Sequence, residues 1–137
     1  ALKITTNKFL PEYQDQIETV IVEHVEGDAC QTTVIDLKLG KVFTTNGSIE
    51  NLSADDIVGD ADDATKDAII NSMNNRNICR WEAENVEQDS DITGTEAGCT
   101  IIVKISDDTC YGSSYRLGNS TGDMGGFVSD IESLVLN

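Results

Sequence analysis

The chain has 137 residues, a formal net charge of −16 and four cysteines, and its length predicts a single domain over residues 1–137. Nucleic-acid binding needs a basic surface, which so acidic a chain lacks, and no apolar run approaches the roughly 18 residues of a membrane span. We therefore expect no nucleic-acid partner and no transmembrane segment. The charge favours a basic partner, a divalent cation or simply a solvated acidic surface.

The first third of the chain predicts β-structure. A short edge strand could open it, and Pro11 suits the first turn of a short helix. Residues 17–25 fit one face of a helix, yet they are β-branched almost throughout, which favours a strand. Residues 30–39 alternate between apolar and polar side chains, so the two runs predict a hairpin around a glycine-containing turn. A third strand is expected at 41–45, ending at the turn signal Asn46-Gly47.

The remainder predicts helices and further strands. An alanine-rich stripe favours a helix over 61–75, and alternation favours strands at 79–84, 99–105 and 109–117. Apolar residues spaced for one helical face predict a C-terminal helix over 124–135. The expected fold is α+β, with an antiparallel sheet of about five or six strands and two helices packed on one face.

An even number of cysteines without a CxxC pair favours two disulfides over a zinc site. Four cysteines allow three pairings. If the strands that begin near Cys79 and Cys99 pair, these two residues form one disulfide and leave Cys30 with Cys110 as the other. Disulfides indicate an oxidising compartment; four buried thiols in a cytosolic protein are the alternative.

Three glycosylation sequons begin at Asn46, Asn51 and Asn119, each in a predicted loop. Such loops also occur without sugar, but the sequons agree with the predicted disulfides. Together they predict an extracellular, cell-surface or periplasmic location.

One acidic loop starts like a calcium-binding loop, with alternating oxygen side chains and a glycine. The twelfth position, where an EF-hand places a bidentate acid, is Thr100, so the EF-hand requirement fails. A looser calcium site is the hypothesis and an ordinary solvated loop the alternative. Its candidate ligands are Asp89, Asp91, Thr93 and Glu96.

A second acidic cluster precedes the helix predicted at 61–75 and could attract a cation or a basic partner, or could simply start the helix. The sole histidine, His24, lacks the neighbours of a metal site and is expected on the first hairpin. The cluster consists of Asp55, Asp56, Asp60, Asp62 and Asp63.

No complete catalytic motif is present. The segment 122–126, GDMGG, resembles the GDSGG motif of chymotrypsin-like proteases, but Met124 replaces the nucleophilic serine. Nucleotide-binding loops and the G-x-S-x-G elbow are missing as well, so we expect no enzymatic activity and no cofactor besides calcium.

The segment 10–15, LPEYQD, resembles the PxYQDY segment in the first helix of type IV pilins. That resemblance implies a helix packed on an antiparallel sheet in an extracellular filament, although the long apolar half-helix of pilins is missing here. The leading hypothesis is a secreted or surface-exposed, non-catalytic structural or binding domain, with a protein partner or self-assembly. The alternatives are an acidic cytosolic inhibitor or immunity-type protein that blocks a basic partner, and a calcium-dependent binding domain.

Overall fold

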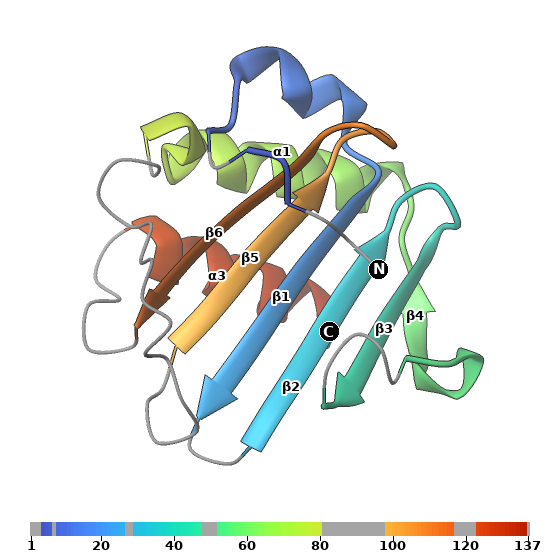
Figure 1. The fold of residues 1–137 in the computed structure, drawn as a ribbon. Helices are drawn as coiled ribbons and strands as arrows, with labels where there is room; N and C mark the ends of the chain where they lie inside the picture. Colours follow the sequence, from blue (N-terminus) through green and yellow to red (C-terminus); the bar gives the residue numbers. More distant parts are fainter. Residues whose placement is uncertain are drawn as a thin grey trace.

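The computed structural model describes residues 4–6, 8–26, 29–47, 52–80, 98–116 and 123–136. They form an α+β fold with a six-stranded antiparallel sheet in the order β4-β3-β2-β1-β5-β6, and Figure 1 shows both helices behind this sheet. The predicted fold class is therefore confirmed. The strands are β1 (Thr19–Glu26), β2 (Ala29–Asp36), β3 (Lys41–Asn46), β4 (Ile57–Asp60), β5 (Gly98–Lys104) and β6 (Cys110–Arg116), and the helices are α1 (Asp63–Asn75) and α3 (Asp123–Leu136).

The central strand β1 explains why residues 17–25 were ambiguous in sequence. It pairs with β2 on one side and with β5 on the other. Val20 and Val22 face the helices, whereas Ile21 faces the opposite side of the sheet, and all three are buried. A strand buried on both faces is apolar without interruption, so the alternation that identifies a strand is lost.

The turn between β2 and β3 is closed by the Asp36 carboxylate. Its Oδ1 accepts hydrogen bonds from the backbone N–H groups of Lys38 at 3.1 Å and Leu39 at 2.8 Å. Gly40 follows with a φ of +78°, a conformation in which a side chain would be strained. This turn leaves the Leu39 side chain 61% exposed.

The main core lies between the sheet and the two helices. A capping box starts α1, because Asp62 Oδ1 accepts from the Thr65 N–H at 2.9 Å while the Thr65 hydroxyl accepts from the Asp62 N–H. The buried residues that the helices contribute are Ile69 and Met73 of α1 and Phe127, Val128 and Ile131 of α3.

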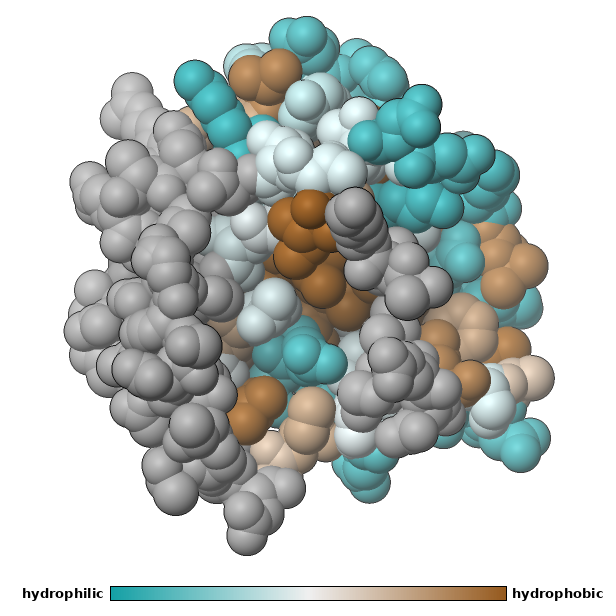
Figure 2. Space-filling view, in the orientation of Figure 1, coloured by the Kyte–Doolittle hydropathy of each residue, from teal (hydrophilic) through white to brown (hydrophobic). Residues whose placement is uncertain are grey.

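A second, smaller apolar cluster lies on the other face of the sheet. Phe43, Val34, Ile21 and Ile102 are direct cross-strand neighbours, so they form a row across β3, β2, β1 and β5. Leu52 packs against this row. Figure 2 shows apolar atoms gathered in the middle of this face.

The prediction of two disulfides is wrong, because no disulfide joins any of the four cysteines. Cys30 lies in β2 and Cys110 in β6, with β1 and β5 between them. Three strand spacings of about 4.8 Å separate them by roughly 14 Å across the sheet alone. The register adds a further offset along the strands, because Cys30 aligns through Val25 and Gly98 with Arg116 and not with Cys110. A disulfide requires Cα atoms within about 7 Å.

The proposed pairing of Cys79 with Cys99 rested on a strand that starts at Cys79. The chain instead forms a short 3₁₀ turn, Ile78–Arg80, after α1, and residues 81–97 lie outside the described residues. Cys99 on β5 has His24 and Tyr115 as its cross-strand neighbours. The register therefore places no cysteine of β1 or β6 directly opposite Cys99.

Candidate functional site

The predicted calcium ligands Asp89, Asp91, Thr93 and Glu96 lie outside the described residues, so the calcium site stays a prediction. Over the ranges that the structure describes, no group of three or more His, Cys, Asp or Glu side chains could hold a metal ion. None of the helices in the same ranges is long and apolar enough to cross a membrane.

Of the predicted glycosylation sites, Asn51 and Asn119 lie outside the described residues. Asn46 is exposed at the end of β3. Glycosylation at Asn46 stays a prediction. The extracellular location loses its strongest support, since the predicted disulfides are not formed.

The acidic cluster predicted from sequence lies around strand β4. Asp55 and Asp56 belong to the 3₁₀ turn Ala54–Asp56 that leads into the strand, and Asp60 is its last residue. Asp62 caps the following helix, and its hydrogen bond from the Thr65 backbone N–H holds the pKa of its carboxyl below the usual value. The cluster therefore both shapes the local chain and places negative charge at each end of β4.

Strand β4 is the exposed edge of the described sheet. It stands at the end of the strand order and pairs with β3 alone among the described strands, with a register shift between Val42 and Phe43. All four of its residues are exposed. Its two apolar side chains, Ile57 and Val58, are 40% and 55% exposed, and Leu39 lies at the turn beside the end of β4. Figure 2 shows apolar atoms over this edge, on the right of the view.

The opposite edge, β6, is covered by the start of the chain. Thr6 forms a parallel bridge with Tyr111, and its carbonyl accepts a hydrogen bond from the Gly112 N–H at 3.0 Å. The Ile4 side chain packs against Gly112, where even a Cβ would clash with it. The two edges of the sheet are thus unequal, and sequence analysis missed β4 because its four residues, IVGD, carry no alternation.

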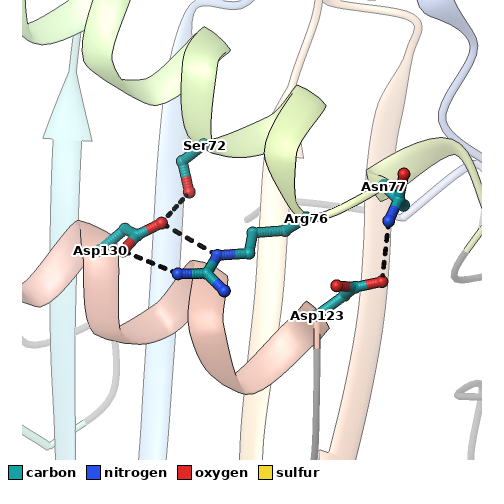
Figure 3. A network of polar contacts seen from close by, with 5 residues as sticks. All are labelled: Ser72, Arg76, Asn77, Asp123 and Asp130. Carbon is teal, nitrogen blue, oxygen red and sulfur yellow. Dashed lines mark hydrogen bonds and ion pairs between the residues drawn. The ribbon is translucent and has the colours of Figure 1, made fainter.

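A polar network ties α1 to α3 (Figure 3). The Ser72 hydroxyl donates to Asp130 Oδ2 at 2.7 Å, and the Arg76 guanidinium donates to both Asp130 oxygens at 3.2 and 3.4 Å. At the end of α1, Asn77 donates to Asp123 at 3.1 Å. Burial raises the pKa of Asp130, but the hydrogen bonds from Ser72 and Arg76 and the Arg76 charge outweigh it and hold that pKa below its usual value.

This network serves packing rather than nucleophilic chemistry. A serine nucleophile needs a base that can accept its proton, and an ionised carboxylate held by an arginine is a weak base. His24, the only histidine, contacts Glu132 instead, with Nδ1 3.6 Å from Oε2. The structure therefore assigns Ser72 and Asp130 to the helix–helix contact.

A small pocket lies on the helix-facing side of the sheet, where β1, β2 and β3 extend past α3. It has a volume of about 250 Å³. His24 lies on the first hairpin as predicted, but the pocket was not expected, because its polar side chains come from separate strands that only the register brings together. The lining residues are His24, Gln31, Thr33, Thr44, Glu132 and Val135.

No protein-family model, curated protein sequence or solved structure shows a significant similarity to the chain. The functional interpretation therefore rests on the exposed edge β4 and the polar pocket.

Proposed function

We propose that this protein is a non-catalytic binding domain that takes up an extended, basic segment of a partner protein as an additional strand beside β4. The observation that carries the proposal is an edge strand whose four residues are all exposed, with apolar side chains in its middle and carboxylates around both of its ends. It agrees with the predicted protein partner and, among the alternatives, with an acidic protein that blocks a basic one.

The first support is the exposed backbone of β4. An edge strand offers unpaired N–H and C=O groups, and proteins usually protect such edges with proline, an inward-pointing charge or a covering segment. Ile57, Val58 and Gly59 include neither a proline nor a charge. β-Strand addition uses such an edge, with main-chain hydrogen bonds for affinity and side-chain contacts for specificity.

The second support is the charge around the strand. Asp55 and Asp56 precede β4, and Asp62 and Asp63 follow it. The nearby Lys41 is already paired with Asp60, with Nζ 2.6 Å from Oδ1. This distribution attracts a basic segment and raises its association rate. A second copy of the chain would instead bring two negatively charged edges together.

The test is a titration with two peptides, one alternating lysine with valine and one alternating glutamate with valine. The lysine peptide should shift the NMR signals of residues 57–60 and slow their amide hydrogen exchange, and its affinity should fall as salt is added. Equal binding of the glutamate peptide, or shifts away from β4, would refute the proposal.

Two matched variants sharpen this test. Val58→Asp should abolish peptide binding, because it adds a charge to the apolar part of the edge. Ile4→Asp, which adds the same charge at the covered edge of the sheet, should leave binding unchanged. Size-exclusion chromatography of the peptide-free protein provides the other control, since a dimer that Val58→Asp dissociates would assign β4 to self-association.

A further inference from the structure

On the helix-facing side of the sheet, the side chains change from apolar to polar along the strands. Val22, Ile35 and Val42 belong to the main core. Two residues beyond Val22 on the same face is His24, and two residues beyond Val42 is Thr44. Side chains of a strand alternate between its faces, so the apolar face continues as a polar one where α3 no longer covers it.

The strand register brings these polar side chains together on neighbouring strands. Gln31 lies opposite His24 on one side and Asn46 on the other, and Thr33 lies opposite Thr44. Figure 1 shows α3 crossing behind the sheet toward β2. Glu132 of α3 lies beside these polar side chains and contacts His24. Four polar side chains from three strands, His24, Gln31, Thr33 and Thr44, and the Glu132 carboxylate from a helix therefore line one pocket.

One of these groups lacks a partner. The Thr44 hydroxyl is buried and has no hydrogen-bond partner among the described residues. A buried polar group without a partner is rare in folded proteins, because it keeps the cost of losing water without a compensating bond. An oxygen or nitrogen atom of a ligand in the pocket would satisfy it.

The charges around the pocket favour a cation. Glu132 supplies a carboxylate, and the last turn of α3 carries no basic residue that would offset the negative end of the helix. A metal ion would need more ligands than His24 and Glu132 offer, and no group of three ligands occurs in the described parts of the chain. Hydroxyl and amide side chains instead suit an organic cation that also carries hydroxyl groups.

We propose that this pocket binds a small organic ammonium compound rich in hydroxyl groups. Glu132 receives the ammonium group, and Thr33, Thr44 and Gln31 hydrogen-bond the hydroxyl groups. The pocket, at about 250 Å³, lies just below the size range of roughly 300–1,000 Å³ that drug-sized ligands occupy, so the ligand is smaller than a nucleoside. This site is separate from the edge β4 and does not depend on the function proposed for it.

The experiment compares cationic probes with neutral probes of similar shape. Protonated Tris and protonated glucosamine are titrated against the ¹⁵N-labelled protein, with pentaerythritol and glucose as their neutral counterparts. The cations should give saturable shifts at the amides of Thr33 and Thr44, with binding roughly tenfold or more tighter than that of the neutral probes. Equal binding of cationic and neutral probes, or no shift at these amides with either cation, would overturn the proposal.

Two variants separate the site from the general acidity of the surface. Glu132→Gln should weaken binding of the cations by roughly tenfold or more, whereas Glu12→Gln, which removes the same charge from the exposed 3₁₀ turn Pro11–Gln16, should not. Equal losses in the two variants would mean that the cations bind the surface as a whole. Thr44→Val should weaken binding without unfolding the protein, and unchanged affinity would remove Thr44 from the site.

Discussion

Gly126 of α3 lies against the side chain of Arg76, the residue that follows α1. The effect of replacing Gly126 should therefore depend on whether Arg76 is present. A Cβ at Gly126 would lie 2.5 Å from Cζ and Nη1 of Arg76 and 2.7 Å from its Nε. Such distances are too short, so one group must move. The guanidinium is the far end of a flexible side chain, so we expect Gly126→Ala to displace it from Asp130 while the backbone of α3 stays in place.

The magnitudes follow from two opposing effects. Alanine is favoured over glycine inside a helix by about 1 kcal/mol. The Arg76–Asp130 pair is 38% and 39% exposed, so its loss costs about 0.2–1 kcal/mol. In the wild type the loss offsets part or all of the gain, which leaves a net stabilisation of about 0–0.8 kcal/mol. In an Arg76→Ala background no guanidinium remains to be displaced, and Gly126→Ala should raise the free energy of unfolding by about 1 kcal/mol.

Chemical denaturation of four proteins measures this difference: the wild type, each single variant and the double variant. The double-mutant cycle should give a coupling of about 0.2–1 kcal/mol between the two positions. If Gly126→Ala stabilises the wild type and the Arg76→Ala protein equally, the guanidinium does not pack over Gly126. The interhelical network would then have a different geometry.

Three further predictions concern single side chains. Thr44→Val keeps the shape of a half-buried side chain and removes its buried, unpartnered hydroxyl, so the free energy of unfolding without ligand should rise by about 1 kcal/mol. A decrease in denaturation experiments would mean that the hydroxyl is bonded. Burial opposes the charge of Asp130, but hydrogen bonds and an arginine hold its pKa below the usual value. The carboxylate therefore stabilises the fold above its unfolded pKa, which is near 4. It loses this effect as the pH falls through the lower pKa of the folded state. The stability difference between the wild type and Asp130→Asn should therefore shrink below about pH 4, by a fraction of a kcal/mol because the group is partly exposed, and a constant difference would contradict the assignment. Burial is the largest cause that raises the pKa of the Cys30 and Cys110 thiols. Native alkylation followed by mass spectrometry should label the partly exposed Cys30 before the buried Cys110. The reverse order of labelling would contradict the packing.

The fold class could be predicted because local patterns carry it. Residues 30–39 were expected as a strand and form β2 as far as Asp36, where the turn to β3 begins. The helical spacing of residues 124–135 identified α3 to within one residue at each end. The strand at β1 was favoured by β-branching even though both of its faces are apolar. In each case the pattern reflects how one element buries its own side chains, which neighbouring residues in sequence can reveal.

The disulfides and the polar pocket could not be predicted in the same way, because both depend on strand order. An even number of cysteines says nothing about distance, and β1 and β5 lie between Cys30 and Cys110. The pocket likewise requires the pairing of Thr33 with Thr44 and the arrival of Glu132 from the end of the chain. These are long-range contacts, and a local sequence pattern leaves them open.

Strand β3 is where the two proposed binding surfaces meet. Its backbone holds β4, its Thr44 side chain lines the pocket, and between them Val42 and Phe43 are buried on opposite faces of the sheet. Coupling between two sites requires an element with two arrangements, and a strand packed on both faces and paired on both sides offers only one. We therefore expect the surfaces to bind independently, so that saturating Tris leaves the affinity for the lysine–valine peptide unchanged. A change in that affinity would show that β3 moves, and it would locate the movement at the register shift between Val42 and Phe43, where the pairing with β4 is weakest.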